Sequence, residues 1–527
     1  MGRQLKVIFY ILVLGVQIFL ISKIDLKDES IAKAKKTDSY WKETQLGTDE
    51  IEMLLSEDSC YESEESFLGC VNAVSSMAER YHLVLDLDGT LRNFSSEDSE
   101  IRKTEKSELN YWKSEIKTTS HLNFLNIFNG MMAKYSTSEE RAFVISLGIN
   151  GYLSIFKDPH SYLLPAKMYE EVVSRPENAP QHLGFISRES KDKRWVVRKV
   201  FEGSSAYKSG LQKGDVIIEI DKVSIENYYS QIISEKLKAK DTNLLNLTVR
   251  RGSEIKNLDI VRSNDEYPSV ASKIVNSEKG LGLITIHKFA NYTCDAVSKH
   301  LLQLKEQNLK GLMLDLRDNP GGQVDEAACI LNLFVKKGTL LFETRYLDRS
   351  RNSDFYYAEN SPVYNGPIAV LINSGSASAS EIVAGSLKDL GRALLVGERS
   401  FGKGSFQDGK IWGANEKVLL FQTEGMYYFP TGWTTQLVGL VPDIEVHYND
   451  TDLREEDLFY KPLMPKPQLM RPTSKAFANK NLNCELSEFK LLASTSEQDP
   501  QLNEAQSWLD CGFALSTRNN NDRNGSL

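Results

Sequence analysis

The chain lacks several features that mark common protein classes. Its 527 residues carry a net charge of −9, so it has no basic excess of the kind typical of nucleic-acid-binding proteins. None of its six cysteines belongs to a CxxC pair with metal-site spacing. Only seven histidines are present, and no pairing of histidine with aspartate suggests a catalytic triad. The length indicates about three folding units.

Only one long apolar run stands out, and it lies at the N-terminus. Arg3 and Lys6 precede the almost wholly apolar stretch Val7–Ile21, and no small-residue cleavage site follows. The run is shorter than the roughly 20 residues of a comfortable membrane span and fits a secretory signal about as well. We predict an uncleaved signal anchor over residues 1–24, with a cleaved signal peptide as the alternative. Either places the protein on the periplasmic side of the inner membrane or in the periplasm.

Export would place the cysteines in an oxidising compartment, where disulfides form and persist. Two pairs are candidates for disulfides there, Cys60–Cys70 and Cys484–Cys511. Cys294 and Cys329 lie in apolar helical patterns, so we expect them to be core residues. Spacing alone leaves other pairings open.

Changes in periodicity divide the rest of the chain. Helical periodicity comes first, for example in Phe67–Arg80 and Arg141–Phe156. Short strand-like runs such as Trp195–Val200 follow, with a hairpin turn at Arg251-Gly252. The expected segments are a signal anchor (1–24), a linker (25–65), a helical N-terminal region (66–180), a compact β unit (181–265), an α/β core (266–450) and a C-terminal appendage with a tail (451–527).

Strands and helices alternate from Gly280 onward. Leu281–Ile286 and Ile368–Ile372 have the pattern of buried strands, and Thr293–Gln307 that of a helix. Such alternation predicts an α/β unit.

The most informative stretch follows the buried strand Ile368–Ile372. The chain enters a run of small residues that contains Ser376, Ser378 and Ser380, and a helix begins at once. At such a junction, exposed backbone N–H groups and the positive end of the helix dipole stabilise an anion that develops beside a serine. Geometry alone does not choose among the three serines.

A second turn, Gly402-Lys403-Gly404, follows the strand predicted at Ala393–Val396. A lysine held between glycines beside apolar strands is partly desolvated. Desolvation lowers the lysine pKa, and a neutral lysine can take a proton from a serine. Serine–lysine dyads need no histidine.

Residues 373–407 resemble the catalytic segment of the C-terminal processing, or tail-specific, peptidases, which are S41-type serine proteases. The likeness is carried by Ser378-Ala379-Ser380-Glu381, by Asp389 with Arg392-Ala393, and by Gly397 through Gln407. The resemblance implies that Ser378 is the nucleophile, Lys403 the general base and Gln407 the residue that orients the lysine. It assigns structural roles to Asp389 and Glu381, and it implies no metal or organic cofactor.

Two further segments resemble the same family. Leu314 through Gly322 is similar to its Leu-Asp-Leu-Arg-x-Asn-x-Gly-Gly motif. That resemblance implies an oxyanion hole made by the amide of Ala379 and one amide of the Gly321–Gly322 turn, without choosing the glycine. Asp158-Pro159-His160-Ser161-Tyr162 resembles the family's helix-end motif before its binding domain.

Residues 182–262 resemble a PDZ domain. Leu183-Gly184-Phe185 matches a carboxylate-binding loop, and Lys213 through Ile217 matches the most recognisable part of that domain. A PDZ groove adds a peptide as an edge strand while loop amides hold its terminal carboxylate. The resemblance therefore implies protein substrates with unstructured C-termini, and homo-oligomers remain open.

Together these features predict a multidomain α+β protein. A helical N-terminal region and a PDZ-like β domain precede an α/β serine protease core of the crotonase/ClpP-like type. The anchor would make the membrane a partner, and no nucleic acid is expected.

Two alternatives compete with this interpretation. Asp86-Leu87-Asp88-Gly89-Thr90 matches the nucleophile loop of haloacid-dehalogenase phosphatases, which bind magnesium. Residues 92–180 are too few and too helical to supply the remaining motifs of such enzymes, so we expect a turn here. A catalytically inactive PDZ scaffold is disfavoured because Ser378, Lys403 and Gln407 are all present.

Overall fold

The computed structural model describes most of the folded chain. The described residues are 40–81, 83–93, 112, 122–169, 183–190, 194–201, 203–225, 233, 237, 244–261, 269–412, 416–447, 454–458 and 499–510. Within these ranges no helix is both long and apolar enough to cross a bilayer. The predicted signal anchor and the predicted Cys484–Cys511 disulfide lie outside them.

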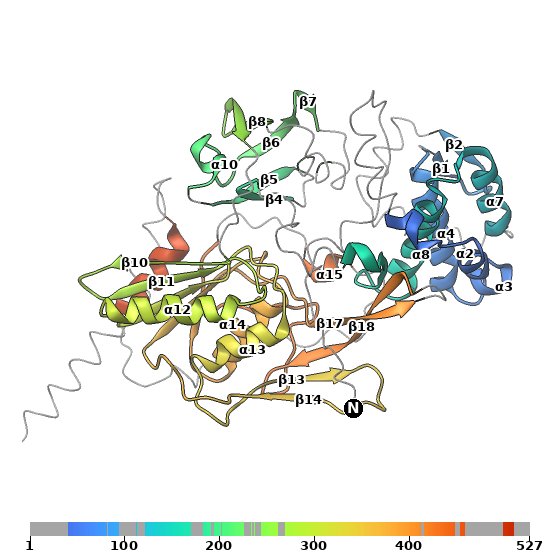
Figure 1. Ribbon diagram of the computed structural model, residues 1–527. Coiled ribbons are helices and arrows are strands. Elements are labelled where there is room, and N and C mark those ends of the chain that lie inside the picture. Colours follow the sequence, from blue (N-terminus) through green and yellow to red (C-terminus); the bar gives the residue numbers. More distant parts are fainter. Residues whose placement is uncertain are drawn as a thin grey trace, which may run out of the picture.

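Three bodies follow one another along the chain (Figure 1): a helical body, a small β domain and a larger α/β core. The predicted α+β class and the order of the parts are confirmed. The individual domain boundaries stay predictions.

Two long helices form the centre of the helical body, α4 (Glu64–Glu79) and α8 (Arg141–Phe156). Glycines let them approach closely. A β-carbon on Gly151 would lie 2.6 Å from Ser76 Oγ and 2.8 Å from Asn72 O, so a larger residue would force the two helices apart. A third helix, α7 (Phe124–Tyr135), buries one face in the same core.

Part of the segment predicted as a linker is folded onto this body. It contains α2 (Asp49–Leu54) and α3 (Glu57–Cys60), and Ile51 and Leu55 are buried in the same hydrophobic cluster as α4 and α8. Of the two interpretations of this segment, a linker or a loose helix, the helical one describes these residues. Burial of a few apolar side chains within a charged stretch is enough to hold short helices against a preformed core.

The Asp-Leu-Asp-Gly-Thr motif forms a hairpin turn, as expected. It joins β1 (Leu83–Leu85) to β2 (Leu91–Asn93), which pair antiparallel. Asp88 accepts hydrogen bonds from both the amide and the hydroxyl of Thr90, and Asp86 pairs with Arg92. Both carboxylates are thus used within the hairpin. This two-stranded antiparallel sheet does not have the doubly wound architecture of a phosphatase of that type.

The small β domain is a sheet in the order β4-β5-β6-β8-β9, with β7 paired to β6. Two of the predicted strands, Trp195–Val200 and Val216–Ile220, have the expected bounds. β4 lies at one edge of the sheet among the described strands, so one side of it is open to a further strand. The elements are β4 (Phe185–Glu189), β5 (Trp195–Val200), α10 (Ser205–Lys208), β6 (Val216–Ile220), β7 (Val223–Ser224), β8 (Leu244–Arg251) and β9 (Glu254–Val261).

The core is built on a sheet in the order β10-β11-β12-β15-β16-β19. β10 pairs antiparallel with β11, and all the other neighbours are parallel, which confirms the predicted α/β unit. The elements are β10 (Val270–Asn276), β11 (Leu281–Ile286), α12 (Thr293–Glu306), β12 (Gly311–Asp315), α13 (Val324–Asn332), β15 (Ile368–Ile372), α14 (Ala379–Asp389), β16 (Leu394–Gly397), β19 (Ile444–Glu445) and α15 (Glu455–Leu458).

Both faces of this sheet are buried, and successive side chains of a strand point to opposite faces. Leu312 and Leu314 belong to the cluster under α12, α13 and α14, whereas Met313 belongs to the opposite cluster. That opposite face is covered by a helix over residues 500–510, through Ala505 and Leu509 among others. The C-terminal appendage predicted from sequence is therefore partly an integral layer of the core.

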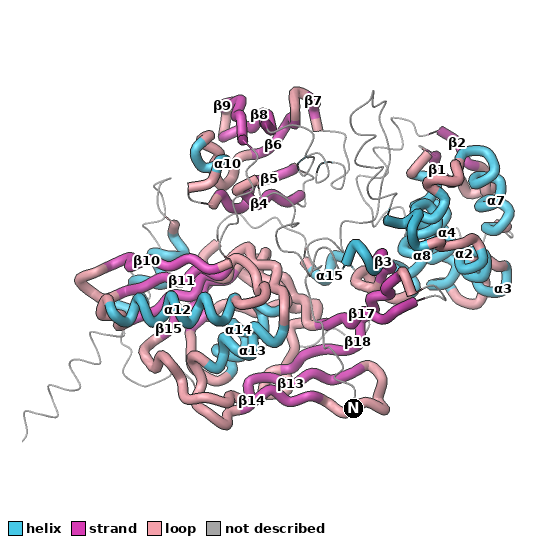
Figure 2. Tube along the Cα trace, in the orientation of Figure 1, coloured by secondary structure: helices cyan, strands magenta, loops and turns pink. Residues whose placement is uncertain are grey.

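A second core sheet was not predicted from the sequence. Its order is β14-β13-β18-β17, and β3 of the helical body pairs with β18 (Figure 2). Trp412 and Val418 of the β17–β18 hairpin pack in the hydrophobic cluster of the helical body, so this hairpin ties the two bodies together. The elements are β3 (Tyr162–Pro165), β13 (Leu340–Tyr346), β14 (Asp354–Tyr357), β17 (Ser405–Trp412) and β18 (Val418–Tyr428).

Two disulfides join described residues. Cys60–Cys70 links α3 to α4 and confirms the prediction. Cys294–Cys329 links α12 to α13 and overturns the prediction of two unpaired core cysteines. The two helices pack side by side and bring the cysteines' Cα atoms to 5.9 Å. The apolar pattern of each helix gives no sign of this, because the cysteines are 35 positions apart.

Loss of the Cys294–Cys329 disulfide should destabilise the core by about 4 kcal/mol, against about 3 kcal/mol for loss of Cys60–Cys70 from the helical body. The reason is the longer closed loop, with sequence separations of 35 and 10. Denaturant unfolding of the C294A/C329A and C60A/C70A variants, each against oxidised wild type, measures both losses. Peptide mapping without reduction is the control for the pairing. Free Cys294 thiol in oxidised wild type would contradict the assignment.

Candidate active site

Three loops of the core meet at one edge of the main sheet. They follow the C-terminal ends of β12, β15 and β16, which are consecutive parallel neighbours in that sheet. The loops hold the Gly321–Gly322 turn, Ser378 and Lys403 respectively. Loops after the carboxyl ends of parallel strands are the usual place for a binding site in α/β proteins.

The loop after β15 distinguishes the three serines. Ser376 Oγ donates to Leu316 O at 2.8 Å, and Ser380 Oγ donates to Asn319 O at 2.9 Å, so both hydroxyls are committed to backbone carbonyls. Ser378 is the N-cap of α14 and has φ +54° and ψ −116°. A serine held in such a sparsely populated conformation at a strand-to-helix junction is typical of a functional position. The geometry therefore singles out Ser378.

The turn after β12 lies directly against this loop. Asn319 O accepts a hydrogen bond from Ala377 N at 3.0 Å. A β-carbon on Gly321 would lie 2.9 Å from both Ala379 N and Ser378 Cβ, and its φ is +101°. Only glycine fits at this position, because any side chain would collide with the serine loop.

The two glycines of the turn differ in what their amides do. Gly321 N donates to Asn319 Oδ1 at 2.9 Å. Among the contacts of the described residues, the Gly322 N–H has no acceptor. Of the two glycines, Gly322 is thus the one whose amide is not committed to another group among the described contacts.

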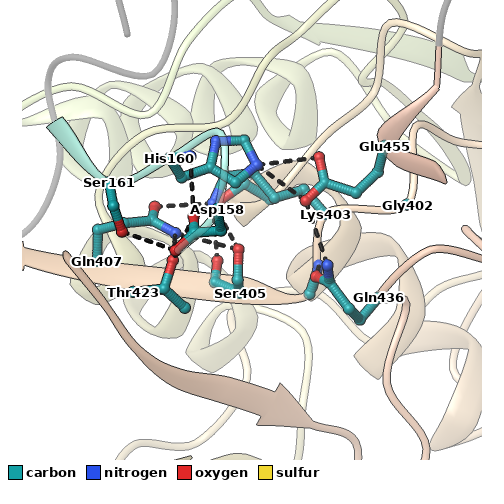
Figure 3. Close-up of polar contacts among 12 residues, drawn as sticks. Asp158, His160, Ser161, Gly402, Lys403, Ser405, Gln407, Thr423, Gln436 and Glu455 are labelled. Atoms are coloured by element: carbon teal, nitrogen blue, oxygen red, sulfur yellow. Dashed lines mark hydrogen bonds and ion pairs between the residues drawn. The ribbon is translucent and has the colours of Figure 1, made fainter. Parts of the chain in front are cut away.

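Lys403 is fully buried in the loop after β16. Its Nζ donates to Gln407 Oε1 at 2.8 Å and to the hydroxyl and carbonyl of Ser405, both at 3.0 Å (Figure 3). Burial lowers the pKa of Lys403 to about 8, although the carboxylates of Glu455, Asp158 and Glu381 partly oppose this shift. The predicted contact between Gln407 and Lys403 is present. No hydrogen bond between Lys403 Nζ and Ser378 Oγ occurs among the described contacts.

Glu381 holds the serine and lysine loops together. Its Oε2 accepts from Ser378 N at 3.0 Å and from Lys403 N at 2.8 Å. Its Oε1 accepts from Gly402 N at 2.8 Å and from the hydroxyl of Ser400. Burial raises the pKa of this carboxyl to about 8, and the four hydrogen bonds oppose the shift. The contacts agree with the structural role predicted for Glu381.

Asp389, also predicted to be structural, lies away from this cluster at the end of α14. It accepts hydrogen bonds from the amide and hydroxyl of Thr431 at 3.0 and 2.7 Å. These contacts fasten α14 to the loop after β18.

The predicted tail-binding residues lie at the start of edge strand β4. The carbonyl of Gly184 accepts from Phe201 N at 2.9 Å and from Ser204 Oγ at 3.1 Å, which fixes the loop. The other end of β4 approaches the catalytic loops, since a β-carbon on Gly375 would lie 3.2 Å from Arg188 Nη1. The side chain of Arg188 thus reaches the serine loop, while Phe201 beside the tail-binding loop contacts His287 of the core at 4.9 Å between ring centroids.

Comparison with known proteins adds a family to this geometry. The model of peptidase family S41 matches residues 280–446, and the PDZ domain model matches residues 172–250. The chain belongs to peptidase family S41.

Relatives of this S41 chain carry similar names. A probable CtpA-like serine protease of Staphylococcus aureus strain COL is 30% identical over 354 residues, or 66% of each chain. A protein of the same name from Staphylococcus epidermidis is 28% identical over 56% of this chain and 60% of its own. The matches thus span just under two thirds of the relatives' length. A solved photosystem II D1 C-terminal processing protease is 25% identical, with a TM-score of 0.45, over 61% of this chain and 86% of that one.

Several buried polar residues around the S41 site were missed by sequence reasoning. His160 Nε2 lies 2.9 Å from Glu455 Oε1, and Asp158 accepts from Thr423 Oγ1 at 3.0 Å. Asp158 and His160 were noted only as a helix-end motif. Glu455 lies 295 positions from His160, and nothing local marks the pair.

A charged cluster next to the Gly321–Gly322 turn was also missed. Arg317 is buried, binds both carboxylate oxygens of Asp315, and pairs with Asp499 at 2.7 Å. Gln501 Oε1 accepts from the same guanidinium at 3.1 Å. Asp499 and Gln501 of the C-terminal segment therefore hold Arg317 in place. Arg317 lies two positions before Asn319, and Asn319 anchors the Gly321–Gly322 turn.

Replacing Glu381 by alanine should lower the free energy of unfolding of the core by roughly 3–5 kcal/mol, because four buried donors lose their acceptor. Urea unfolding followed by circular dichroism measures the loss. Ser386→Ala is the matched control: it lies on the same helix, and its buried Oγ has no hydrogen-bond partner among the described residues. It should stay within about 0.5 kcal/mol of wild type. Equal stability of the two variants would show that Glu381 does not hold the serine and lysine loops together.

Proposed function

We propose that this chain is a serine endopeptidase that recognises protein C-termini through its PDZ domain and cleaves with a Ser378–Lys403 dyad. One observation carries the proposal: a strained serine at a strand-to-helix junction and a buried lysine are hydrogen-bonded through their amides to the same carboxylate. Membership of the S41 family and the names of the relatives support the same activity.

The proposed reaction begins with Lys403 in its neutral form. Its Nζ turns from Ser405 toward Ser378 Oγ and takes the hydroxyl proton while the oxygen attacks a peptide carbonyl carbon. The new C–O bond leaves an oxyanion, which the amides of Ala379 and Gly322 stabilise. When the C–N bond breaks, the leaving amine takes the proton from Lys403. Water, deprotonated by Lys403 in turn, then hydrolyses the ester and restores Ser378.

Gln407 keeps the lysine within reach during these steps. Its carbonyl oxygen is the hydrogen-bond acceptor at 2.8 Å from Nζ, and it comes from β17, whose pairing with β18 is regular on either side of one bulge. A partner on a sheet strand limits the rotamers of a long side chain that would otherwise be free to turn away.

Substrate capture would use the open edge of β4. An extended C-terminal peptide can pair with this strand while the loop at Leu183, Gly184 and Phe185 receives its carboxylate. Because the Arg188 side chain of β4 reaches the loop that holds Ser378, a chain paired with β4 would lie close to that loop.

We also propose that the protein works on the exported side of a membrane. The two disulfides support this, since such bonds persist in oxidising compartments. The apolar run Val7–Ile21 supplies a signal or an anchor.

The direct test is cleavage of an unfolded protein by the chain from residue 25 onward, with products mapped by mass spectrometry. We expect wild type to cut a substrate with a free C-terminus faster than the same substrate with an amidated C-terminus. Ser378→Ala and Lys403→Met should each lose at least about a thousandfold in rate, because each removes a member of the dyad.

Three results would count against this function. Full activity of either dyad variant would disprove the site, and equal rates with free and amidated tails would disprove tail recognition. Tight binding of free tails without cleavage would support an inactive PDZ scaffold instead.

The rate of cleavage should rise with pH because the dyad needs an uncharged lysine. Burial places the pKa of Lys403 at about 8, below its ordinary 10.5. Below that pH Lys403 is protonated and cannot accept the serine proton, so kcat/KM should fall about tenfold for each pH unit. A pH profile of kcat/KM with a short tail peptide tests this. An acid limb near pH 4–5, as for a carboxylate base, would contradict it.

A further inference from the structure

A chain of hydrogen bonds leads from the lysine out of the site (Figure 3). Lys403 Nζ donates to Gln407 Oε1 at 2.8 Å, and Gln407 Nε2 donates to Thr423 Oγ1 at 2.9 Å and to Ser405 Oγ at 3.1 Å. Thr423 Oγ1 donates to Asp158 Oδ1 at 3.0 Å. The chain thus begins at a buried base and ends at a carboxylate contributed from outside the catalytic domain.

The chemistry of the groups fixes the direction of every bond in this chain. An ionised carboxylate only accepts, so the Thr423 hydroxyl must give its proton to Asp158. That hydroxyl can then only accept from Gln407, which turns the amide NH₂ toward it and the amide oxygen toward Lys403. With the amide reversed, NH₂ would face the lysine and two donors would oppose each other.

The fold holds the three outer groups in register. Gln407 of β17 and Thr423 of β18 are cross-strand partners, and β18 also pairs with β3, which begins four residues after Asp158. Asp158 is buried and accepts two more hydrogen bonds, from His160 N at 2.8 Å and from Ser161 Oγ at 2.7 Å. Its carboxylate is thus held from three sides.

We propose that Asp158 is a positioning residue for the dyad, acting through Thr423 to set the orientation of Gln407 and so the place of Lys403. The proposal rests on the proposed peptidase function. Asp158 lies just after the C-cap of α8, a helix of the helical body. The proposal therefore gives the helical body a role in positioning the lysine as well as in packing.

Asp158 also contributes charge. The groups that face Lys403 are Glu381 of α14, Glu455 of α15 and Asp158, with His160 paired to Glu455 and the Tyr427 hydroxyl donating to Lys403 O. Each of these carboxyl groups favours the protonated lysine when it is ionised, and burial raises the pKa of Glu381 itself to about 8. Removing the charge of Asp158 therefore makes the lysine easier to deprotonate.

Two substitutions separate the charge from the hydrogen bonds. Asp158→Asn keeps the pattern: its amide oxygen can accept from His160 N and Thr423 Oγ1, both of which bond the same oxygen now, and its NH₂ can donate to Ser161 Oγ. Only the charge is lost. Thr423→Val keeps the charge and breaks the chain, and Thr423→Ser restores the hydroxyl.

The experiment measures pH profiles of kcat and KM for tail-peptide cleavage by the four proteins, after melting curves show that each is folded. We expect D158N to shift the acid limb to lower pH by roughly half a unit or more. We expect T423V to lower kcat about tenfold or more with KM little changed. We expect T423S to recover most of wild-type kcat.

Wild-type kcat in T423V, or no recovery in a folded T423S, would overturn the proposal, as would an unmoved acid limb in D158N. If D158N fails to fold, the pair of Thr423 variants decides alone. If wild type showed no cleavage that depends on Ser378, the proposed peptidase function would be wrong, and this inference would fall with it.

Discussion

The carboxylate of Glu381 accepts four hydrogen bonds from two loops that follow neighbouring parallel strands, β15 and β16. One loop presents Ser378 and the other Lys403, so a single buried group sets the separation of the two backbones. The third loop joins the same frame through Asn319, whose carbonyl accepts from Ala377 N and Ser380 Oγ. Close packing of glycine backbones leaves these loops little freedom to drift apart.

The pKa of Lys403 results from two opposed effects. Burial favours the neutral amine, and the carboxylates of Glu455, Asp158 and Glu381 favour the charged ammonium. The balance, a pKa of about 8, lies within reach of ordinary pH. A general base is most useful there, because it is deprotonated often enough and still holds a proton well. With fewer carboxylates nearby, the pKa of Lys403 would be lower and the amine would be a weaker base. With more carboxylates, the lysine would stay protonated at ordinary pH.

How far the sequence predicts this molecule depends on the range of each interaction. Ser378, Lys403 and Gln407 lie within 30 positions, and short motifs of small residues mark the region. Local pattern left three serines open, and only the family resemblance singled out Ser378 and Gln407. The strands β11, β15 and β16 of the main sheet are apolar runs and were predicted almost to the residue, whereas β10 and β19 were not predicted. β17 has a mixed burial pattern, with three buried residues followed by partly exposed ones, and so has no clean period. Pairs such as His160–Glu455 and Cys294–Cys329 depend on which elements become neighbours, and single segments do not encode that.

Segments outside the family match contribute charged groups to the site. The S41 match covers residues 280–446. Asp158 precedes that range, while Glu455 and Asp499 follow it, and these three carboxylates face Lys403 or Arg317. Without them the lysine would lose two of its three nearby negative charges, and a buried guanidinium would keep only Asp315 as a pair. A charge buried with half its partners costs several kcal/mol. The unit that can hold the proposed dyad in place is therefore the core together with the segment that follows α8 and the C-terminal segments, and not the S41-matched region alone.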